Sequence, residues 1–169
     1  VVGYTNAGKS SLTNALTQKG AHVADALFAT LDTRVGKIWY PDESGSGKGR
    51  ELLVSDTIGF IQDLPPELID AFRSTLDETV DADLLLHVID VSDKDFVEKI
   101  AEVEGILSQL NVGHIPKIYV FNKIDKAKRF SKATLIKTYK AFTPVFVSAI
   151  TGDGIKELKA QLGATLLKN

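Results

Sequence analysis

The stretch GYTNAGKS, from Gly3 to Ser10, combines residue types and a spacing that suit the binding of phosphate groups. It matches the pattern G-x-x-x-x-G-K-S/T, in which glycines allow backbone N–H groups to converge on phosphate oxygens. Lys9 can reach the β- and γ-phosphates of a nucleoside triphosphate, and the Ser10 hydroxyl can bind Mg²⁺. The residues expected to contact the nucleotide from this loop are Gly3, Asn6, Ala7, Gly8, Lys9, Ser10 and Ser11.

Two later segments indicate which base the nucleotide carries. NKID, from Asn122 to Asp125, and SAI, from Ser148 to Ile150, each follow a short apolar run. The Asp125 carboxylate can accept hydrogen bonds from N1–H and the 2-amino group of guanine, whereas adenine has an acceptor at N1 and lacks that amino group. We therefore predict GTP and GDP as ligands. The residues expected at the base are Asn122, Lys123, Asp125, Ser148, Ala149 and Ile150.

DTIG, from Asp56 to Gly59, supplies the remaining chemistry. Asp56 can hold Mg²⁺ through a water molecule, and the Gly59 N–H can bond to the γ-phosphate. Loss of the γ-phosphate removes that bond and lets the segment relax, which is the physical basis of a nucleotide switch. We therefore expect Lys9 and Gly59 among the residues that promote catalysis.

Strands and helices must bring these segments together. Apolar runs at 51–56, 83–90, 116–122 and 143–148 predict buried strands, and helical patterns cover 9–19, 67–80, 96–110, 131–141 and 153–168. Ser92 and Asp95 form an expected capping box before the third helix. With Val1-Val2 and an antiparallel hairpin of 33–40 against 51–56, this predicts an α/β fold. Its sheet has about six strands, mostly parallel with one antiparallel edge strand, and helices cover both faces.

Composition limits the class of protein. The 169 residues suit a single domain, and 20 basic against 22 acidic residues exclude a global attraction to nucleic acid or anionic lipid. Cysteine is absent, so neither disulfides nor thiolate metal sites are expected, and no apolar run is long enough for a membrane span. We expect a cytoplasmic monomer, one GTPase domain over residues 1–169. Val1-Val2 suggests that the chain begins within its first strand.

The order of these motifs is that of P-loop GTPases, and the chain resembles the HflX family of ribosome-associated GTPases. The resemblance is carried by GYTNAGKSSLTNAL, ADALFATLD, DTIGFIQDLPPELIDAFRSTL, ADLLLHVIDVSD and VFNKID. It implies a Ras-like fold, GTP hydrolysis, and binding to ribosomal RNA and protein of the large subunit in rescuing or splitting stalled ribosomes. By comparison with related GTPases, Thr30 is expected to meet Mg²⁺ and the γ-phosphate and to join Lys9 and Gly59 as a catalytic residue, with Thr33 as the alternative. The metal set is then Ser10, Thr30 and Asp56.

The chain departs from the usual pattern at positions that bear on the rate. Phe60 stands where Ras-like enzymes usually present the Gln that orients water, which predicts slow intrinsic hydrolysis and a need for stimulation. A GTP-dependent binding module with negligible hydrolysis is therefore the alternative function. Asn6 resembles the Asn of K⁺-stimulated GTPases, or it bonds only within its own loop. Ile150 replaces the usual Lys of S-A-K, which predicts weaker stacking on the base.

Overall fold

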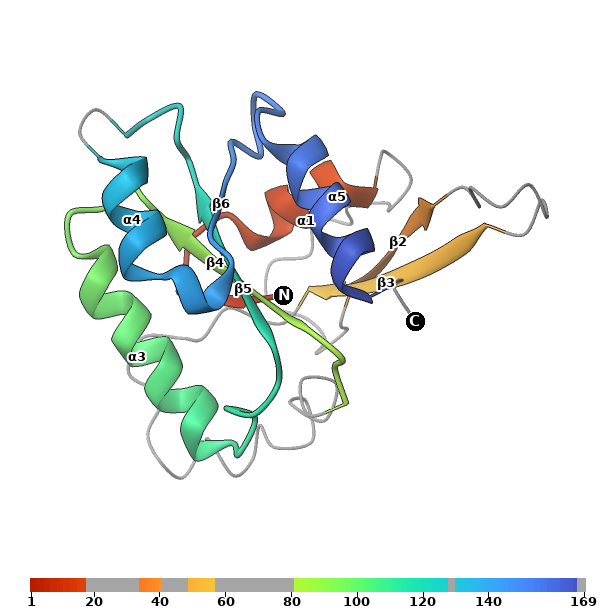
Figure 1. Ribbon diagram of the computed structural model, residues 1–169, viewed down its shortest axis with the longest axis horizontal. Helices are drawn as coiled ribbons and strands as arrows, with labels where there is room; N and C mark the ends of the chain where they lie inside the picture. The colour runs from red at the N-terminus through yellow and green to blue at the C-terminus, as the bar shows by residue number, and fades with distance from the viewer. Residues whose placement is uncertain (18–33, 41–48, 57–80, 128–129, 167–169) are drawn as a thin grey trace, which may run out of the picture.

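The computed structural model describes residues 1–17, 34–40, 49–56, 81–127 and 130–166. Four strands form a parallel sheet in the order β1-β4-β5-β6, and two more form an antiparallel pair, β2-β3 (Figure 1). The strands are β1 (Val2–Gly3), β2 (Arg34–Tyr40), β3 (Arg50–Asp56), β4 (Leu85–Asp90), β5 (Lys117–Asn122) and β6 (Val145–Phe146).

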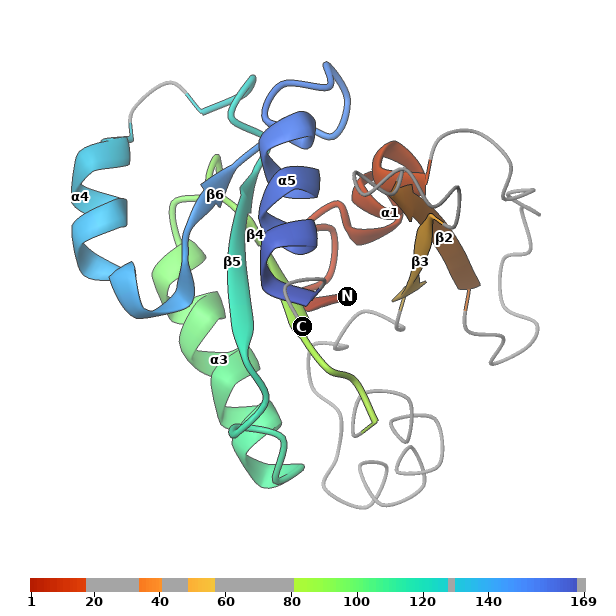
Figure 2. The same cartoon turned by 45° about the vertical axis from the view of Figure 1, so that its right-hand side comes forward.

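Helices cover both faces of the parallel sheet. They are α1 (Lys9–Thr17), α3 (Phe96–Gln109), α4 (Lys132–Thr138) and α5 (Ile155–Leu166), with a 3₁₀ turn η1 at Lys140–Phe142. In Figure 2, α1 and α5 lie on one side of the sheet and α3 and α4 on the other. Within the described residues, no helix is both long and apolar enough to cross a membrane.

The continuous apolar runs of β4 and β5 follow from burial on both faces. Side chains alternate across a strand, so each run supplies two cores. Leu86, Val88, Ile118 and Val120 pack toward α1 and α5, together with Leu12 and Leu158. On the other face, Leu85 packs with α3, while Tyr119 and Phe121 pack near α4. This arrangement leaves the carboxyl ends of the strands to carry the polar segments.

The predicted α/β architecture is confirmed, with differences in detail. The antiparallel hairpin forms as expected, but in the described part it is a separate two-stranded sheet rather than the edge of a single six-stranded one. It is tied to the rest by the Val1 amino group, which donates to the Ser55 carbonyl, and by the Tyr40 hydroxyl, which donates to the Lys159 carbonyl. The helix predicted at 67–80 lies outside the described residues.

The expected capping box before α3 is wrong. Asp95 precedes α3 but makes no side-chain capping bond, and the Ser92 hydroxyl donates instead to Asp90. The short side chain of Ser92 reaches the carboxylate two residues back before it can reach the helix. The β4–α3 loop is therefore organised around Asp90.

A partly buried polar cluster joins α3 to the sheet. The Glu104 carboxylate accepts hydrogen bonds from Lys117 Nζ (2.5 Å) and the Tyr119 hydroxyl (2.9 Å), and its Oε1 lies 3.3 Å from His87 Nδ1. Burial acts to raise the pKa of Glu104, but these three hydrogen bonds outweigh it and lower the pKa to about 2. Burial lowers the pKa of His87, so this residue is a neutral core histidine, as its position in an apolar strand predicts.

Replacing Glu104 should destabilise the fold. Glu104→Gln removes the counter-charge of Lys117, whose side chain is 8% exposed, and we expect the free energy of unfolding to fall by about 3 kcal/mol. The pKa of Glu104 is lower in the folded chain than its ordinary 4.5, so its contribution is complete above about pH 4.5 and is lost toward pH 2. Urea unfolding at pH 7 and pH 3 checks this prediction. The difference in free energy of unfolding between the original chain and Glu104→Gln should be smaller at pH 3 than at pH 7.

The exposed Glu102 on the same helix provides the control for this prediction. Glu102→Gln should shift the free energy of unfolding by less than about 0.5 kcal/mol at either pH. An equal effect of the two substitutions, or a gap that widens in acid, would contradict the role given to the cluster.

Candidate nucleotide-binding site

The loop from Gly3 to Ser10, called the P-loop below, connects β1 to α1 through backbone angles that require glycine. Gly3 has φ +150°, and a Cβ there would lie 2.4 Å from the Val88 carbonyl oxygen. Gly8 has φ +94°, and a Cβ there would lie 2.4 Å from Asn122 Nδ2. The predicted glycines are thus needed both for conformation and for close approach of neighbouring segments.

Lys9 begins α1 and folds back over the P-loop. Its Nζ donates to the carbonyl oxygens of Gly3 (3.1 Å) and Tyr4 (2.8 Å), and the residue is only 8% exposed. Burial lowers the pKa of Lys9, an effect that the nearby Asp56 carboxylate opposes. Ser10 and Ser11 are exposed in the first helical turn, where N–H groups lack partners within the helix. The start of α1 therefore offers a cation and free donors to an anion.

Asp56, the last residue of β3, has an unused oxygen. The residue is 9% exposed, and Oδ1 is buried without a hydrogen-bond partner in the part of the chain that the structure describes. A buried carboxylate oxygen without a partner is costly, so it favours a water or cation at this point. No group of three His, Cys, Asp or Glu among the described residues suits a metal ion. Asp56 thus offers a carboxylate oxygen, the kind of ligand that Mg²⁺ prefers.

The NKID segment, called the base loop below, is bonded directly to the P-loop. Asn122 Nδ2 donates to the Ala7 carbonyl (2.9 Å), and Lys123 Nζ donates to the Asn6 carbonyl (2.6 Å). Asp125 is exposed two residues further on. Segments more than 110 positions apart in the chain therefore meet at the carboxyl ends of β1 and β5.

The SAI segment completes this corner. The Ala149 N–H donates to Asn122 Oδ1 (3.1 Å), and the buried Ser148 accepts a hydrogen bond at Oγ from the Thr151 N–H (3.2 Å). Ile150 is 75% exposed. Asn122 is thus an amide that links all three segments, with one hydrogen bond to the P-loop and one to SAI.

Several predicted site residues cannot be placed. Thr30 with its alternative Thr33, and Gly59 with the neighbouring Phe60, lie outside the described residues. Their roles at the γ-phosphate and at the attacking water stay predictions.

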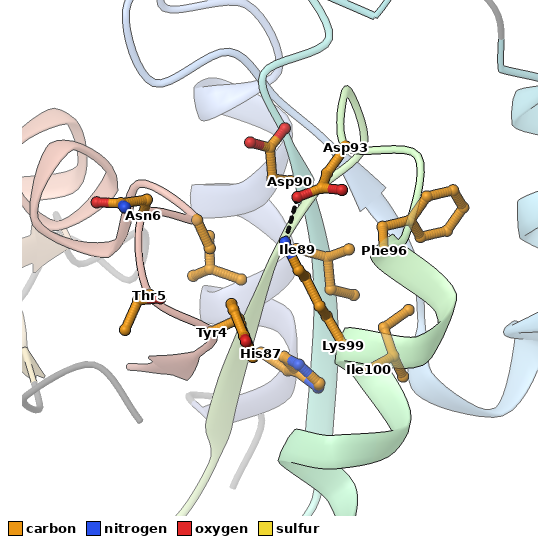
Figure 3. A pocket seen from close by; sticks show the side chains of 12 residues that line it. Tyr4, Thr5, Asn6, His87, Ile89, Asp90, Asp93, Phe96, Lys99 and Ile100 are labelled. Atoms are coloured by element: carbon orange, nitrogen blue, oxygen red, sulfur yellow. Dashed lines mark hydrogen bonds and ion pairs between the residues drawn. The ribbon is translucent and has the colours of Figure 1, made fainter. Parts of the chain in front are cut away.

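The structure adds residues that the sequence analysis did not select. A cavity of about 240 Å³ separates the P-loop from α3 and is lined by Asp90, Asp93 and Lys99 among others (Figure 3). Lys99 pairs with Asp93 and lies 4.8 Å from the centre of the Tyr4 ring. The sequence feature that could have pointed to these residues is HVIDVSD, residues 87–93. Its two carboxylates come at the end of a buried strand, at the same edge of the sheet as the base loop.

A P-loop between β1 and α1, held by an N-K-x-D segment at the end of β5, defines a P-loop GTPase. The model of the family described as 50S ribosome-binding GTPase matches residues 1–123, and the chain belongs to this family.

The resemblance to the HflX family is confirmed by curated relatives. The chain is 43% identical to GTPase HflX of Magnetococcus marinus over 96% of this chain and 36% of that protein. It is 54% identical to GTPase HflX of Caldanaerobacter subterraneus over 74% of this chain and 28% of that protein. It is 42% identical to GTPase HflX of Escherichia coli over 94% of this chain and 36% of that protein. The chain spans about a third of the length of these relatives.

Solved structures agree with the fold. The complex of SsGBP with GDP superposes with a TM-score of 0.69 at 26% identity, covering 99% of this chain and 48% of that one. A GTP-binding protein from the archaeon Sulfolobus solfataricus, also in complex with GDP, superposes with a TM-score of 0.66 at 27% identity. The match covers 95% of this chain and 51% of that one.

Proposed function

We propose that this chain is a switch domain that binds GTP and hydrolyses it to GDP and phosphate with Mg²⁺. The observation that carries the proposal is the pair of hydrogen bonds from Asn122 and Lys123 to the P-loop carbonyls. These bonds place the segment suited to guanine beside the segment suited to phosphates. One nucleotide can then contact both segments, with its base near Asp125 and its phosphates at the start of α1.

Hydrolysis requires a water oxygen to bond to the γ-phosphorus while the bond from that phosphorus to the β–γ bridging oxygen breaks, and the water gives up a proton to the departing phosphate or to solvent. Negative charge moves toward GDP, and catalysis consists mainly of positioning and charge stabilisation. Lys9 carries the charge suited to this task. Its ammonium group has three N–H donors, and the hydrogen bonds to the Gly3 and Tyr4 carbonyls use two of them, so one donor is available for a phosphate oxygen.

The proposed metal site uses the orphaned Asp56 oxygen and the Ser10 hydroxyl. Bound Mg²⁺ would neutralise phosphate charge and orient the triphosphate. Thr30, or Thr33, and the Gly59 N–H are proposed to close the site over the γ-phosphate.

We also propose that the protein acts in the cytoplasm on the large ribosomal subunit, through ribosomal RNA and protein, in ribosome rescue or splitting. The family description, 50S ribosome-binding GTPase, supports this partner. Residues 126–142, which follow the base loop in the chain, contain six basic and no acidic residues, and Lys132, Lys137 and Lys140 are exposed there. Such a segment suits phosphate backbone. Residues 1–169 would form one monomeric GTPase domain of a longer protein.

The decisive experiment measures binding and turnover together. Fluorescent GDP, GTP and ATP are titrated with Mg²⁺, and phosphate release is followed with and without large ribosomal subunits. We expect guanine nucleotides to bind at least a hundredfold more tightly than ATP, and ribosomes to raise the rate. Equal binding of ATP would reject the proposal. Guanine binding without turnover, even with ribosomes, would favour the alternative of a GTP-dependent binding module.

We also propose that a bound K⁺ supplies additional positive charge beside the phosphates during hydrolysis. The Asn6 backbone carbonyl already accepts from Lys123, while the exposed Asn6 side chain lies at the rim of the loop. If Asn6 helps to hold K⁺ beside the phosphates, hydrolysis should be about tenfold faster in KCl than in NaCl, and Asn6→Ala should remove the difference. Equal rates in the two salts would leave Asn6 with only its loop contacts.

A further inference from the structure

The Asp90 carboxylate lies where the P-loop and the base loop meet, although none of the roles assigned above includes it. Asp90 is the last residue of β4 and is opposite Asn122, the last residue of β5, in the parallel register. Lys123 follows directly and donates from Nζ both to Asp90 Oδ2 (2.6 Å) and to the Asn6 carbonyl (2.6 Å). The side chains of Lys123 and Asp90 are only 24% and 20% exposed.

The other oxygen of this carboxylate is held by its own loop. Asp90 Oδ1 accepts from the Ser92 N–H (3.0 Å) and from the Ser92 hydroxyl (2.5 Å). The carboxylate is therefore a fixed acceptor. The lysine that it holds is flexible by nature, and its contact with the P-loop would otherwise cost side-chain entropy. Lys123 also starts from φ +64°, a left-handed conformation uncommon for a residue with a side chain.

The Asn6 carbonyl matters because of the geometry of the peptide unit. The carbonyl of one residue and the N–H of the next point in opposite directions across a planar bond. Lys123 orients the peptide unit between Asn6 and Ala7, whose N–H donates to the Tyr4 carbonyl across the P-loop (3.3 Å). Asn122 orients the unit between Ala7 and Gly8. Backbone N–H groups of such loops are phosphate donors, so their direction decides affinity.

We propose that Asp90 is a positioning residue of the nucleotide site. It holds the Lys123 ammonium against the Asn6 carbonyl and thereby fixes the P-loop in the conformation that binds phosphate. This inference rests on the proposed function. The charges add a distinctive consequence: Asp90 favours an anionic ligand only while Lys123 neutralises it, and without Lys123 it repels the phosphates.

A double-mutant cycle on GDP affinity tests this role. Asp90→Asn should weaken GDP binding about tenfold by releasing Lys123. In the Lys123→Met background the same substitution should strengthen GDP binding about threefold, because it removes an unpaired carboxylate near the phosphates. Asp90→Glu keeps the charge, so its GDP affinity should stay within about threefold of that of the original chain.

The control is Asp95→Asn in the same loop. The Asp95 carboxylate is exposed and lies 4.0 Å from the Lys94 ammonium, an ion pair at the surface, so GDP affinity should not change. An equal loss on Asp90→Asn with and without Lys123 would overturn the proposal, because Asp90 would then act through general stability. GDP binding that is insensitive to Asp90→Asn would overturn it too. Failure of the unchanged chain to bind guanine nucleotides would instead reject the proposed function.

Discussion

Asp125→Asn is expected to change the base preference of this protein from guanine to xanthine. The substitution replaces a carboxylate that accepts two hydrogen bonds by an amide that accepts one and donates one. Guanine then meets a donor at its 2-amino group, whereas the 2-oxo group of xanthine is a matching acceptor. GDP affinity should fall about a thousandfold and affinity for xanthosine diphosphate should rise by a similar factor, as measured with fluorescent nucleotides.

The exposed Asp83 is a matched control, since it precedes β4 at the end of the sheet opposite the base loop. Asp83→Asn should leave both affinities unchanged. If Asp125→Asn also left them unchanged, the assignment of the base loop would be wrong, and with it the choice of GTP as substrate.

Lys9→Met is expected to lower the rate of GTP hydrolysis at least a hundredfold. The substitution keeps most of the apolar stem and removes the ammonium that can stabilise charge on the transferring phosphate. The same substitution should change the free energy of unfolding only slightly. The buried ammonium loses its hydrogen bonds to Gly3 and Tyr4, but its unfavourable burial, which lowers the pKa of Lys9, is also removed. Phosphate release under saturating GTP and thermal unfolding of the nucleotide-free chain give the two quantities.

Lys156, exposed on α5, is the control for loss of a positive charge. Lys156→Met should hydrolyse GTP at the original rate. An unchanged rate in Lys9→Met would show that the P-loop lysine does not contact the reacting phosphate. A collapse of stability in Lys9→Met would show that its main role is structural.

The sequence by itself determined the elements and most of the candidate site. Apolar runs bounded by polar residues predicted β4 and β5 because both faces of these strands are buried, and the stripe from Phe96 to Leu110 predicted α3. The P-loop and NKID were readable because their chemistry depends on residue types at short, fixed spacings. These are properties of short segments, so they can be recognised in the sequence without knowledge of the fold.

Only the tertiary structure decided which distant groups share a bond. The register of β4 against β5 brings Asp90 beside Lys123, and the packing of α3 brings Glu104 over His87, Lys117 and Tyr119. Neither pairing has a characteristic spacing in the chain, because strand register and helix packing follow from how the whole core fills space. The sequence therefore determined the chemistry available to the nucleotide, and the fold decided which neighbours hold that chemistry in place.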